Sequence, residues 1–226
     1  NKYLTGCGHC PDLSLIPEVR GDKTRENLTF KKKQILDLPI NFIYPSKWVE
    51  KKMSRIRLNE KSSTRVIEDS VDLNKFIKNK SEISRSELGL DKSDIILLAI
   101  SSGDENCYKD ITTTINAFHK IEKEFKNLKL IIIGAGSLSN QLSSSKNILL
   151  KGKIYNQDDL IMYYNCSDIF IHSANVETWC LTVTEARAMG LPIIASDVGG
   201  IPEQIHQNVE MNAINNTKGN GLLFER

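Results

Sequence analysis

Short apolar segments alternate with amphipathic segments along the chain beyond residue 94. The apolar segments are rich in Ile, Leu and Val without polar residues at alternate positions, which is typical of parallel strands covered on both faces. The strands predicted from this pattern are 94–100, 128–136, 147–152, 168–174 and 192–198. The helices predicted between them are 110–125, 156–166 with Asn156 as its N-cap, and 181–189. The pattern therefore predicts a doubly wound α/β domain, in which ligands bind beyond the carboxyl ends of the strands.

The first 70 residues follow a less regular pattern. An irregular loop turns into a basic helix, and a strand at 40–46, a helix at 47–58 and a second strand from residue 63 follow. We interpret residues 1–72 as the tail of a preceding Rossmann-like α/β domain and residues 73–226 as a second domain, which a polar segment at 78–93 leads into. The chain is accordingly expected to be a piece of a longer protein.

Charge is distributed unevenly along the chain. Residues 1–61 hold 13 of the 30 Lys and Arg and 7 of the 28 Asp and Glu, which leaves 17 basic and 21 acidic residues for the remainder. The basic first quarter favours an anionic partner, but it lacks the dense patch typical of nucleic-acid binding, so no nucleic-acid partner is expected. No apolar run approaches the roughly 18 residues of a membrane span. The five cysteines are an odd number and do not form a secreted disulfide framework, so the expected location is the cytoplasm.

The segment 174–203, "ANVETWCLTVTEARAMGLPIIASDVGGIPE", carries the candidate chemistry. Glu177 is expected in a loop ahead of a helix, and Glu185 about one turn inside that helix, so both carboxylates can face one cavity. Between them, the free N–H groups and positive dipole end of the helix N-terminus favour a phosphate. Two hydroxyl acceptors that flank an anion site match a nucleotide sugar, in which a diphosphate joins a ribose to a hexose. Two glutamates near a helix start can also be a solvated surface favourably placed against the dipole.

This segment resembles the signature of the retaining GT-B glycosyltransferases of family 4. The matching residues are Glu177, Glu185-Ala186, 188–192, 194–196 and 199–203. "YPSKWVEKKM" resembles a segment of family members that build polysaccharides, "TRVIEDSVDLNKF" resembles the linker between the two GT-B halves, and "CGHCP" resembles a region of colanic-acid-type relatives. The resemblance implies the end of an acceptor-binding domain joined to most of a nucleotide-sugar (donor) domain.

The resemblance also implies roles for individual residues. Glu177 would hold the donor hexose, Glu185 the ribose hydroxyls, and Lys109 the phosphates, where its charge would offset the charge of the departing nucleotide. A lysine at a helix start can equally be a surface residue. The remaining donor-binding residues are the backbone N–H groups of Trp179, Cys180, Leu181 and Thr182 for the diphosphate, and the backbone of Gly152, Lys153 and Ile154 for the base. The family implies transfer with retention from a donor such as a UDP-sugar to a glycan or lipid-linked acceptor, without a metal or other cofactor.

Three departures from the family pattern leave other functions open. Asp104 and Glu105 stand where relatives place an arginine, and Asp110 stands where they place a glycine. Thr178 and Cys180 replace two glycines after Glu177. A non-catalytic glycosyltransferase-like subunit is therefore the first alternative, and a sugar-nucleotide 2-epimerase of the same fold is the second.

Two further features allow two interpretations each. Cys7 and Cys10 have the spacing of a zinc or redox pair, but a loop near the acceptor site is favoured because no second ligand pair is visible. The basic helix around Trp48 could touch a membrane or a polyprenyl phosphate, but packing of Trp48 on its own sheet is favoured. Cys107 and Cys180 are interpreted as packing residues, because no general base lies near either in the sequence.

Overall fold

The computed structural model describes residues 4–11, 13, 20–35, 38–55, 62–78, 83–101, 108–134, 145–206 and 219–225. The chain divides into two compact units, Asn1–Asp69 and Ser70–Arg226. Each unit is described by itself below. Within the described residues, no helix combines the length and the apolar character needed to cross a bilayer.

The second unit is built on one parallel sheet of six strands in the order β5-β4-β3-β6-β7-β8. The strands are β3 (Ile95–Ile100), β4 (Leu128–Ile133), β5 (Ile148–Lys151), β6 (Ile169–His172), β7 (Ile193–Ser196) and β8 (Gly221–Phe224). The first five confirm the predicted strands, whereas β8 was not predicted. It extends the sheet by pairing in parallel with β7.

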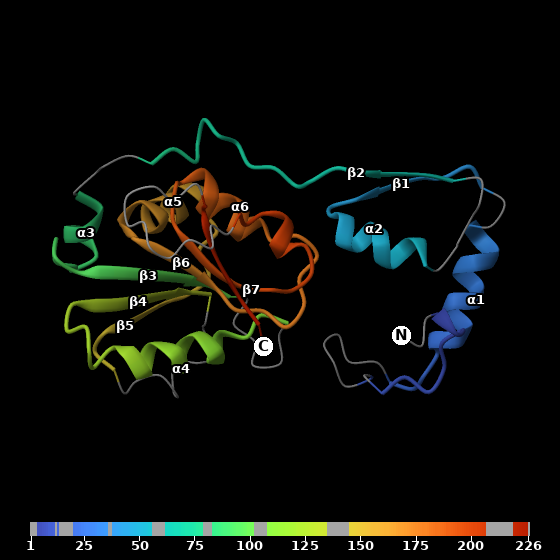
Figure 1. Ribbon diagram of the computed structural model, residues 1–226, viewed down its shortest axis with the longest axis horizontal. Helices are drawn as coiled ribbons and strands as arrows, with labels where there is room; N and C mark the ends of the chain where they lie inside the picture. Colours follow the sequence, from blue (N-terminus) through green and yellow to red (C-terminus); the bar gives the residue numbers. More distant parts are fainter. Residues whose placement is uncertain are drawn as a thin grey trace. The chain divides into compact units, whose positions relative to one another are not determined.

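Alternate residues of the central strand β3 enter two different cores. Ile96 and Leu98 belong to one buried cluster, and Leu97 and Ala99 belong to the other. Helix α4 (Ile111–Ile121) covers one face of the sheet, while α5 (Gln157–Cys166) and α6 (Leu181–Ala188) cover the opposite face (Figure 1). Burial on both faces explains the unbroken apolar sequence of the strands. The doubly wound fold is confirmed.

Two of these helices begin at side chains that cap them. Asn156 accepts a hydrogen bond from the N–H of Asp158 at 2.9 Å, which confirms Asn156 as the N-cap of α5. Asp110 caps α4 by accepting from the N–H of Thr113 at 3.2 Å. The helix predicted at 110–125 was too long at its end, because α4 stops at Ile121. An N-cap contributes about 1 kcal/mol to a helix.

The segment that was predicted as a polar lead contains a short helix, α3 (Ile83–Glu87), that is fastened to the sheet. The guanidinium of Arg85 donates to Asp168 Oδ1 at 2.8 Å and to the carbonyl oxygen of Cys166 at 3.1 Å. It also donates to the carbonyl oxygen of Asp94 at 3.1 Å. Asp168 in turn accepts from the N–H of Ile96 at 2.8 Å. One side chain therefore ties the lead segment to the starts of β3 and β6.

Replacing Arg85 with alanine is expected to lower the free energy of unfolding by about 2 kcal/mol, because it leaves a half-buried carboxylate and several carbonyls without their donor. Arg85→Lys should lose less, since it keeps the charge but not the planar fork. Urea denaturation measures both, with Lys120→Ala on the exposed side of α4 as the control. An Arg85→Ala value within about 0.5 kcal/mol of that control would contradict the role of Arg85 as a fastener, since that much is ordinary for surface changes.

The first unit has α1 (Thr24–Ile35), β1 (Asn41–Tyr44), α2 (Lys47–Ser54) and β2 (Ser63–Val66). The two strands pair in parallel, and α2 packs against both of them. Ser46 caps α2 by accepting from the N–H of Val49 at 3.2 Å, and Lys52 Nζ lies 5.2 Å from the centre of the Trp48 ring. Packing of α2 on its own sheet agrees with the favoured interpretation of this helix.

Candidate functional site

The predicted site lies where the direction of the sheet connections reverses. From β3 the chain runs through β4 to β5 on one side, and β6 pairs with the other side of β3. Ligands of doubly wound proteins bind at the carboxyl ends of strands whose connections diverge in this way. Lys109 lies in the connection after β3, and Glu177 lies in the connection after β6. The topology therefore places both predicted catalytic residues at the same end of two neighbouring strands.

Backbone hydrogen bonds hold these two connections together. The N–H of Asp110 donates to the carbonyl oxygen of Ser173 at 2.9 Å, and the N–H of Asn175 donates to that of Tyr108 at 2.7 Å. Lys109 and Ala174 form an isolated antiparallel bridge between them. This short ladder pairs the backbone of Lys109 with a residue only three positions before Glu177.

Glu177 is a half-buried carboxylate that interacts with a buried histidine. Its Oε2 lies 3.7 Å from Nε2 of His172, and its Oε1 accepts from the N–H of Thr178 at 3.0 Å. Burial alone would raise the pKa of Glu177, but the hydrogen bond and charge of His172 and the charge of Lys109 outweigh burial and lower it. Glu177 is therefore held in its anionic form.

His172 is the functional residue that sequence reasoning missed. It ends β6 and is almost fully buried, and its Nε2 also lies 3.4 Å from Sγ of Cys180. Burial alone would lower the pKa of His172, but the hydrogen bonds to Cys180 and Glu177 raise it to about 9. Cys180 is buried in a core cluster, which agrees with its interpretation as a packing residue. Its sulfur nevertheless lies beside an imidazole, because the end of β6 and the start of α6 meet in space.

Glu185 has a different partner and a different electrostatic environment. Its Oε2 accepts a 2.7 Å hydrogen bond from the hydroxyl of Tyr164, which is fully buried on α5. Burial raises the pKa of Glu185, and the Tyr164 bond and the charge of Lys109 offset only part of this rise. Lys109 thus influences Glu177 and Glu185 alike, so the structure brings these three predicted residues to one site.

The turn ahead of α6 is held by a buried amide. Nε2 of Gln204 donates to the carbonyl oxygens of Trp179 and, at 3.5 Å, of Cys180. Thr184 Oγ1 donates to Gln204 Oε1 at 2.9 Å and accepts from the Trp179 indole at 3.1 Å. The network explains why Trp179 and Gln204 are buried. Nothing in the sequence motif alone points to Gln204 as its centre.

The predicted diphosphate donors lie in and just ahead of the first turn of α6. They are the backbone N–H groups of Trp179, Cys180, Leu181 and Thr182, at the helix end that favours an anion. Cys180 is the N-cap of α6 and has φ of 91°, in the left-handed region that side chains rarely adopt. This conformation explains why glycine suits the position in relatives of the resembled family, and it makes Cys180 a costly choice here.

The backbone of Gly199 and Gly200 contacts the carbonyl group of Glu177. The N–H of Gly200 donates to the carbonyl oxygen of Glu177 at 3.3 Å. Gly199 has φ of 61°, and a Cβ there would overlap the same carbonyl oxygen. The following residues form the short helix η2 (Ile201–Glu203). Gly199 is therefore required for the close backbone approach, and the N–H of Gly200 holds the carbonyl group of Glu177 in place.

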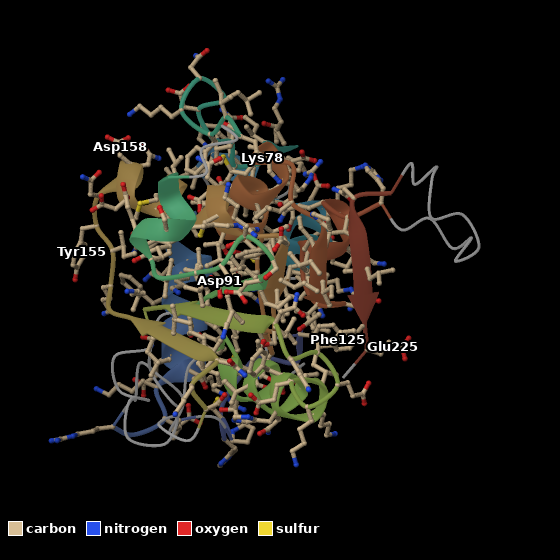
Figure 2. All side chains as sticks on the ribbon, turned by 90° about the vertical axis from the view of Figure 1, so that its left-hand side faces the viewer. Lys78, Asp91, Phe125, Tyr155, Asp158 and Glu225 are labelled. Atoms are coloured by element: carbon tan, nitrogen blue, oxygen red, sulfur yellow. The ribbon has the colours of Figure 1, made fainter. Side chains whose placement is uncertain are left out.

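The predicted base-contacting residues lie apart from the others. Gly152, Lys153 and Ile154 follow β5, which β4 and β3 separate from β6. Three strand spacings correspond to roughly 14 Å. Ile154 packs on a core cluster, while Tyr155 stands out at the edge of the molecule with 89% of its surface exposed (Figure 2).

The departures from the family pattern are only partly described. Asp104, Glu105 and Cys107 lie outside the described residues. The carboxylate of Asp110 is engaged at the start of α4, where it accepts from the N–H and the hydroxyl of Thr113. Its place in the helix cap explains how an acid is accommodated beside Lys109.

Metal-ligating side chains come together once among the residues that the structure describes. His172, Glu177 and Cys180 present ligand atoms within 4.8 Å of one another. In the described part of the chain, neither Cys7 nor Cys10 belongs to any such group of three. The N–H of Cys10 instead donates to Asp22 at 2.8 Å, and hydrogen bonds from Thr24 and this N–H lower the pKa of Asp22 to about 2.

Comparison with known proteins gives relatives of one kind. The chain is 29% identical over 195 residues to the alpha-monoglucosyldiacylglycerol synthase of Streptococcus pneumoniae, a match that covers 80% of the chain and 41% of the relative. It is 30% identical over 142 residues to the N-acetyl-alpha-D-glucosaminyl L-malate synthase of Bacillus anthracis, which covers 60% of the chain and 36% of the relative. The chain thus spans about two fifths of the length of these two relatives.

Solved structures share the fold at low sequence identity. The crystal structure of Anabaena Alr3699/HepE in complex with UDP-glucose has a TM-score of 0.62 and 18% identity, over 81% of this chain and 49% of that one. This likeness confirms the expected α/β fold. The profile of the family described as "Glycosyl transferases group 1" matches residues 80–226. This match covers more than half of the chain, so the chain belongs to the group 1 glycosyl transferases.

Proposed function

We propose that this chain carries the donor site of a retaining hexosyltransferase of the polysaccharide-building type within family 4. In this proposal, the second unit binds a nucleotide sugar, a UDP-sugar in the simplest case, and the hexose passes to a glycan or lipid-linked acceptor. The observation that carries the proposal is the convergence of Lys109, Glu177 and Glu185 where the connections of β3 and β6 diverge. Lys109 lies far from the two glutamates in the sequence, so only the fold brings the lysine to them.

The electrostatics of the site suit a nucleotide diphosphate as leaving group. Lys109 supplies a fixed positive charge, and the N-terminus of α6 supplies N–H groups and a positive dipole end. Charge that develops on the leaving phosphate would meet groups already in place, which is how preorganised sites lower a barrier. No metal ion is needed for this role, and we propose that transfer proceeds without one.

The two glutamates are suited to different hydroxyl groups. Glu177 is held anionic by His172 and Lys109, so it accepts strong hydrogen bonds from the donor hexose. Glu185 is fixed by Tyr164 within the first two turns of α6 and accepts from the ribose. The diphosphate then lies against the amides of 179–182 between them. Gly152, Lys153 and Ile154 remain assigned to the base.

The names of the relatives support retention, and one of them supports a lipid acceptor. Both curated relatives described above are named for alpha-linked products. An α-linked donor gives an α-linked product when the configuration is retained. One relative is named for a diacylglycerol product, and a membrane acceptor agrees with the basic charge of residues 1–61. We propose a cytoplasmic enzyme that contacts the membrane surface through this basic part.

The comparisons do not favour the two alternatives. A non-catalytic subunit was suggested by Asp104 and Glu105, which lie outside the described residues, while the relatives are named as synthases. The relatives named above include no epimerase. Neither alternative is carried further.

Replacing Glu185 with alanine is expected to weaken UDP binding to the chain by roughly 10-fold to 100-fold, because a hydrogen bond to a charged group contributes about 1.5–3 kcal/mol. Isothermal titration calorimetry with UDP measures this loss. Glu87→Ala on the exposed surface of α3, which is fastened at the amino ends of β3 and β6, removes a carboxylate outside the site and serves as the matched control. Unchanged affinity in Glu185→Ala would discredit the ribose assignment.

The same titration separates the two glutamates. Glu177→Ala should weaken UDP-glucose more than it weakens UDP, because only the hexose meets Glu177 in the proposal. Glu185→Ala should weaken both ligands by the same factor. If the two variants show the same selectivity between UDP and UDP-glucose, the assignment of hexose and ribose to different glutamates is wrong.

A further inference from the structure

Three side chains of different chemistry face one another at the carboxyl end of β6. Nε2 of His172 lies 3.4 Å from Sγ of Cys180 and 3.7 Å from Oε2 of Glu177. Only 1% of the His172 side chain and 17% of the Glu177 side chain are exposed. The donor site proposed above uses Glu177, but it assigns no chemistry to the imidazole or to the thiol.

These separations match those between ligands of a tetrahedral zinc ion. With Zn–N and Zn–O bonds of about 2.0–2.1 Å and a Zn–S bond of about 2.3 Å, tetrahedral geometry places a nitrogen roughly 3.4–3.6 Å from an oxygen or sulfur. An imidazole, a thiolate and a carboxylate are the ligands zinc prefers, and three protein ligands with one open position are typical of zinc that meets solutes. All three ligand atoms lie within 4.8 Å of one another, so side-chain rotations can bring them around one ion.

The backbone that carries the three ligands is already held. His172 ends a strand in the middle of the sheet, and Cys180 is the N-cap of α6, with its carbonyl oxygen bound by Gln204. The carbonyl oxygen of Glu177 is bound by the N–H of Gly200. A site preorganised in this way binds a metal without first ordering a loop. Glu177 is the most exposed of the three side chains and provides the open side.

We propose that His172, Glu177 and Cys180 form a binding site for one divalent ion of the zinc type, and that the bound ion excludes the hexose of the donor. The exclusion rests on the proposed function, because it requires that the hexose bind Glu177. The metal site itself does not. Coordination would occupy the carboxylate that the donor sugar needs, so ion and hexose compete for one side chain. The ion therefore inhibits and takes no part in transfer.

Titration of the chain with Co²⁺ tests the metal site without any substrate. Co²⁺ takes the place of zinc and reports a thiolate ligand through a sulfur-to-cobalt charge-transfer absorption in the near ultraviolet. The titration uses a background in which Cys7, Cys10 and Cys107 are replaced by serine, so that Cys166 and Cys180 are the remaining thiols. It is run near pH 9 under reducing conditions, because thiol and imidazole bind metals in deprotonated form and the pKa of His172 is about 9. One equivalent of Co²⁺ should produce the band, and Zn²⁺ should abolish it.

Three variants identify the ligands. Cys180→Gly removes the thiol and replaces a strained left-handed residue with glycine, so the variant is expected to fold. It should weaken Co²⁺ binding by more than roughly 100-fold, because loss of an outer-shell partner alone weakens metal binding by about 10-fold to 100-fold. Cys166→Ser changes the other thiol, which is buried and donates to the carbonyl oxygen of Tyr163, and should keep the band. His172→Ala should also lose it. A band that is absent from the background protein, or that persists in Cys180→Gly, overturns the site.

Calorimetry with and without Zn²⁺ tests the exclusion. Saturating Zn²⁺ should weaken UDP-glucose by at least tenfold and leave UDP within about twofold, because UDP lacks the hexose. In Cys180→Gly the same Zn²⁺ concentration should change neither affinity. If Co²⁺ binds as described but Zn²⁺ leaves UDP-glucose unaffected, the metal site stands and the placement of the hexose at Glu177 fails. If no Co²⁺ binds while UDP-glucose does, the donor site stands and the metal site fails.

Discussion

Replacing Gly199 with alanine is expected to lower the free energy of unfolding by about 3 kcal/mol, because strained left-handed residues cost about 1–3 kcal/mol and a steric overlap adds to that. The added Cβ would overlap the carbonyl oxygen of Glu177, which accepts a hydrogen bond from the N–H of Gly200. Either the loop of Glu177 or the turn at 199–200 has to move. Thermal or urea denaturation measures the loss of stability, and UDP-glucose affinity should fall with it.

Gly190 provides a matched control for this substitution. It has φ of 68°, nearly the value at Gly199, but a Cβ added at Gly190 would meet nothing within 4 Å. Gly190→Ala should therefore cost only the left-handed backbone term of about 1–2 kcal/mol. It should leave UDP-glucose affinity unchanged once the protein is folded. Equal losses of stability in the two variants would show that the contact with Glu177 contributes nothing.

The second large effect concerns pH and the buried imidazole. Because the pKa of His172 is raised from 6.5 to about 9, its protonated form stabilises the fold by up to about 3 kcal/mol. A raised pKa means that this stability is fully present below about pH 6.5 and is lost as the pH rises through about 9. The groups that face the imidazole are Glu177, Cys180 and Lys109. Glu177 has a lowered pKa, so its share of stability is lost instead as the pH falls through the folded value.

The variant His172→Gln makes this measurable. The difference in unfolding free energy between wild type and His172→Gln should shrink by about 2–3 kcal/mol between about pH 6.5 and pH 10. His119→Gln is the control, since His119 also contacts a glutamate, Glu122 at 2.8 Å, but at the protein surface. Urea denaturation at several pH values gives both differences. A His172→Gln difference that is constant with pH would mean that this imidazole is neutral in the folded protein.

Most of the fold could be predicted because the strands have a distinctive composition. Residues 95–100 and 128–133 are buried on both faces, and such burial leaves an almost unbroken apolar sequence that predicts a strand. The N-cap Asn156 is equally local. β8 was not predicted because four residues at the sheet edge carry too little pattern, and they become a strand only through β7. α3 was not predicted, because it is held in place by Arg85, whose partner Asp168 lies 83 residues further along the chain.

The site could be predicted only as far as the family pattern reached. Glu177, Glu185 and Lys109 were identified by resemblance, and the structure places them together. The residues that set their environment are His172, Tyr164 and Gln204. Each belongs to a different element, and an ordinary apolar or polar sequence surrounds it. Their importance arises from burial and from pairing across the fold, which one sequence does not reveal.

The ladder between Tyr108–Asp110 and Ser173–Asn175 has a consequence for how the protein could change over time. Main-chain hydrogen bonds join the loop of Lys109 to the loop of Glu177. A residue inserted into either loop within this ladder would therefore displace both charged side chains. The bonds of the ladder are made by the backbone, so a substitution that keeps Ser173 and Ala174 small and buried leaves them intact. Evolutionary change at this end of the sheet is thereby steered toward substitutions and away from changes in loop length.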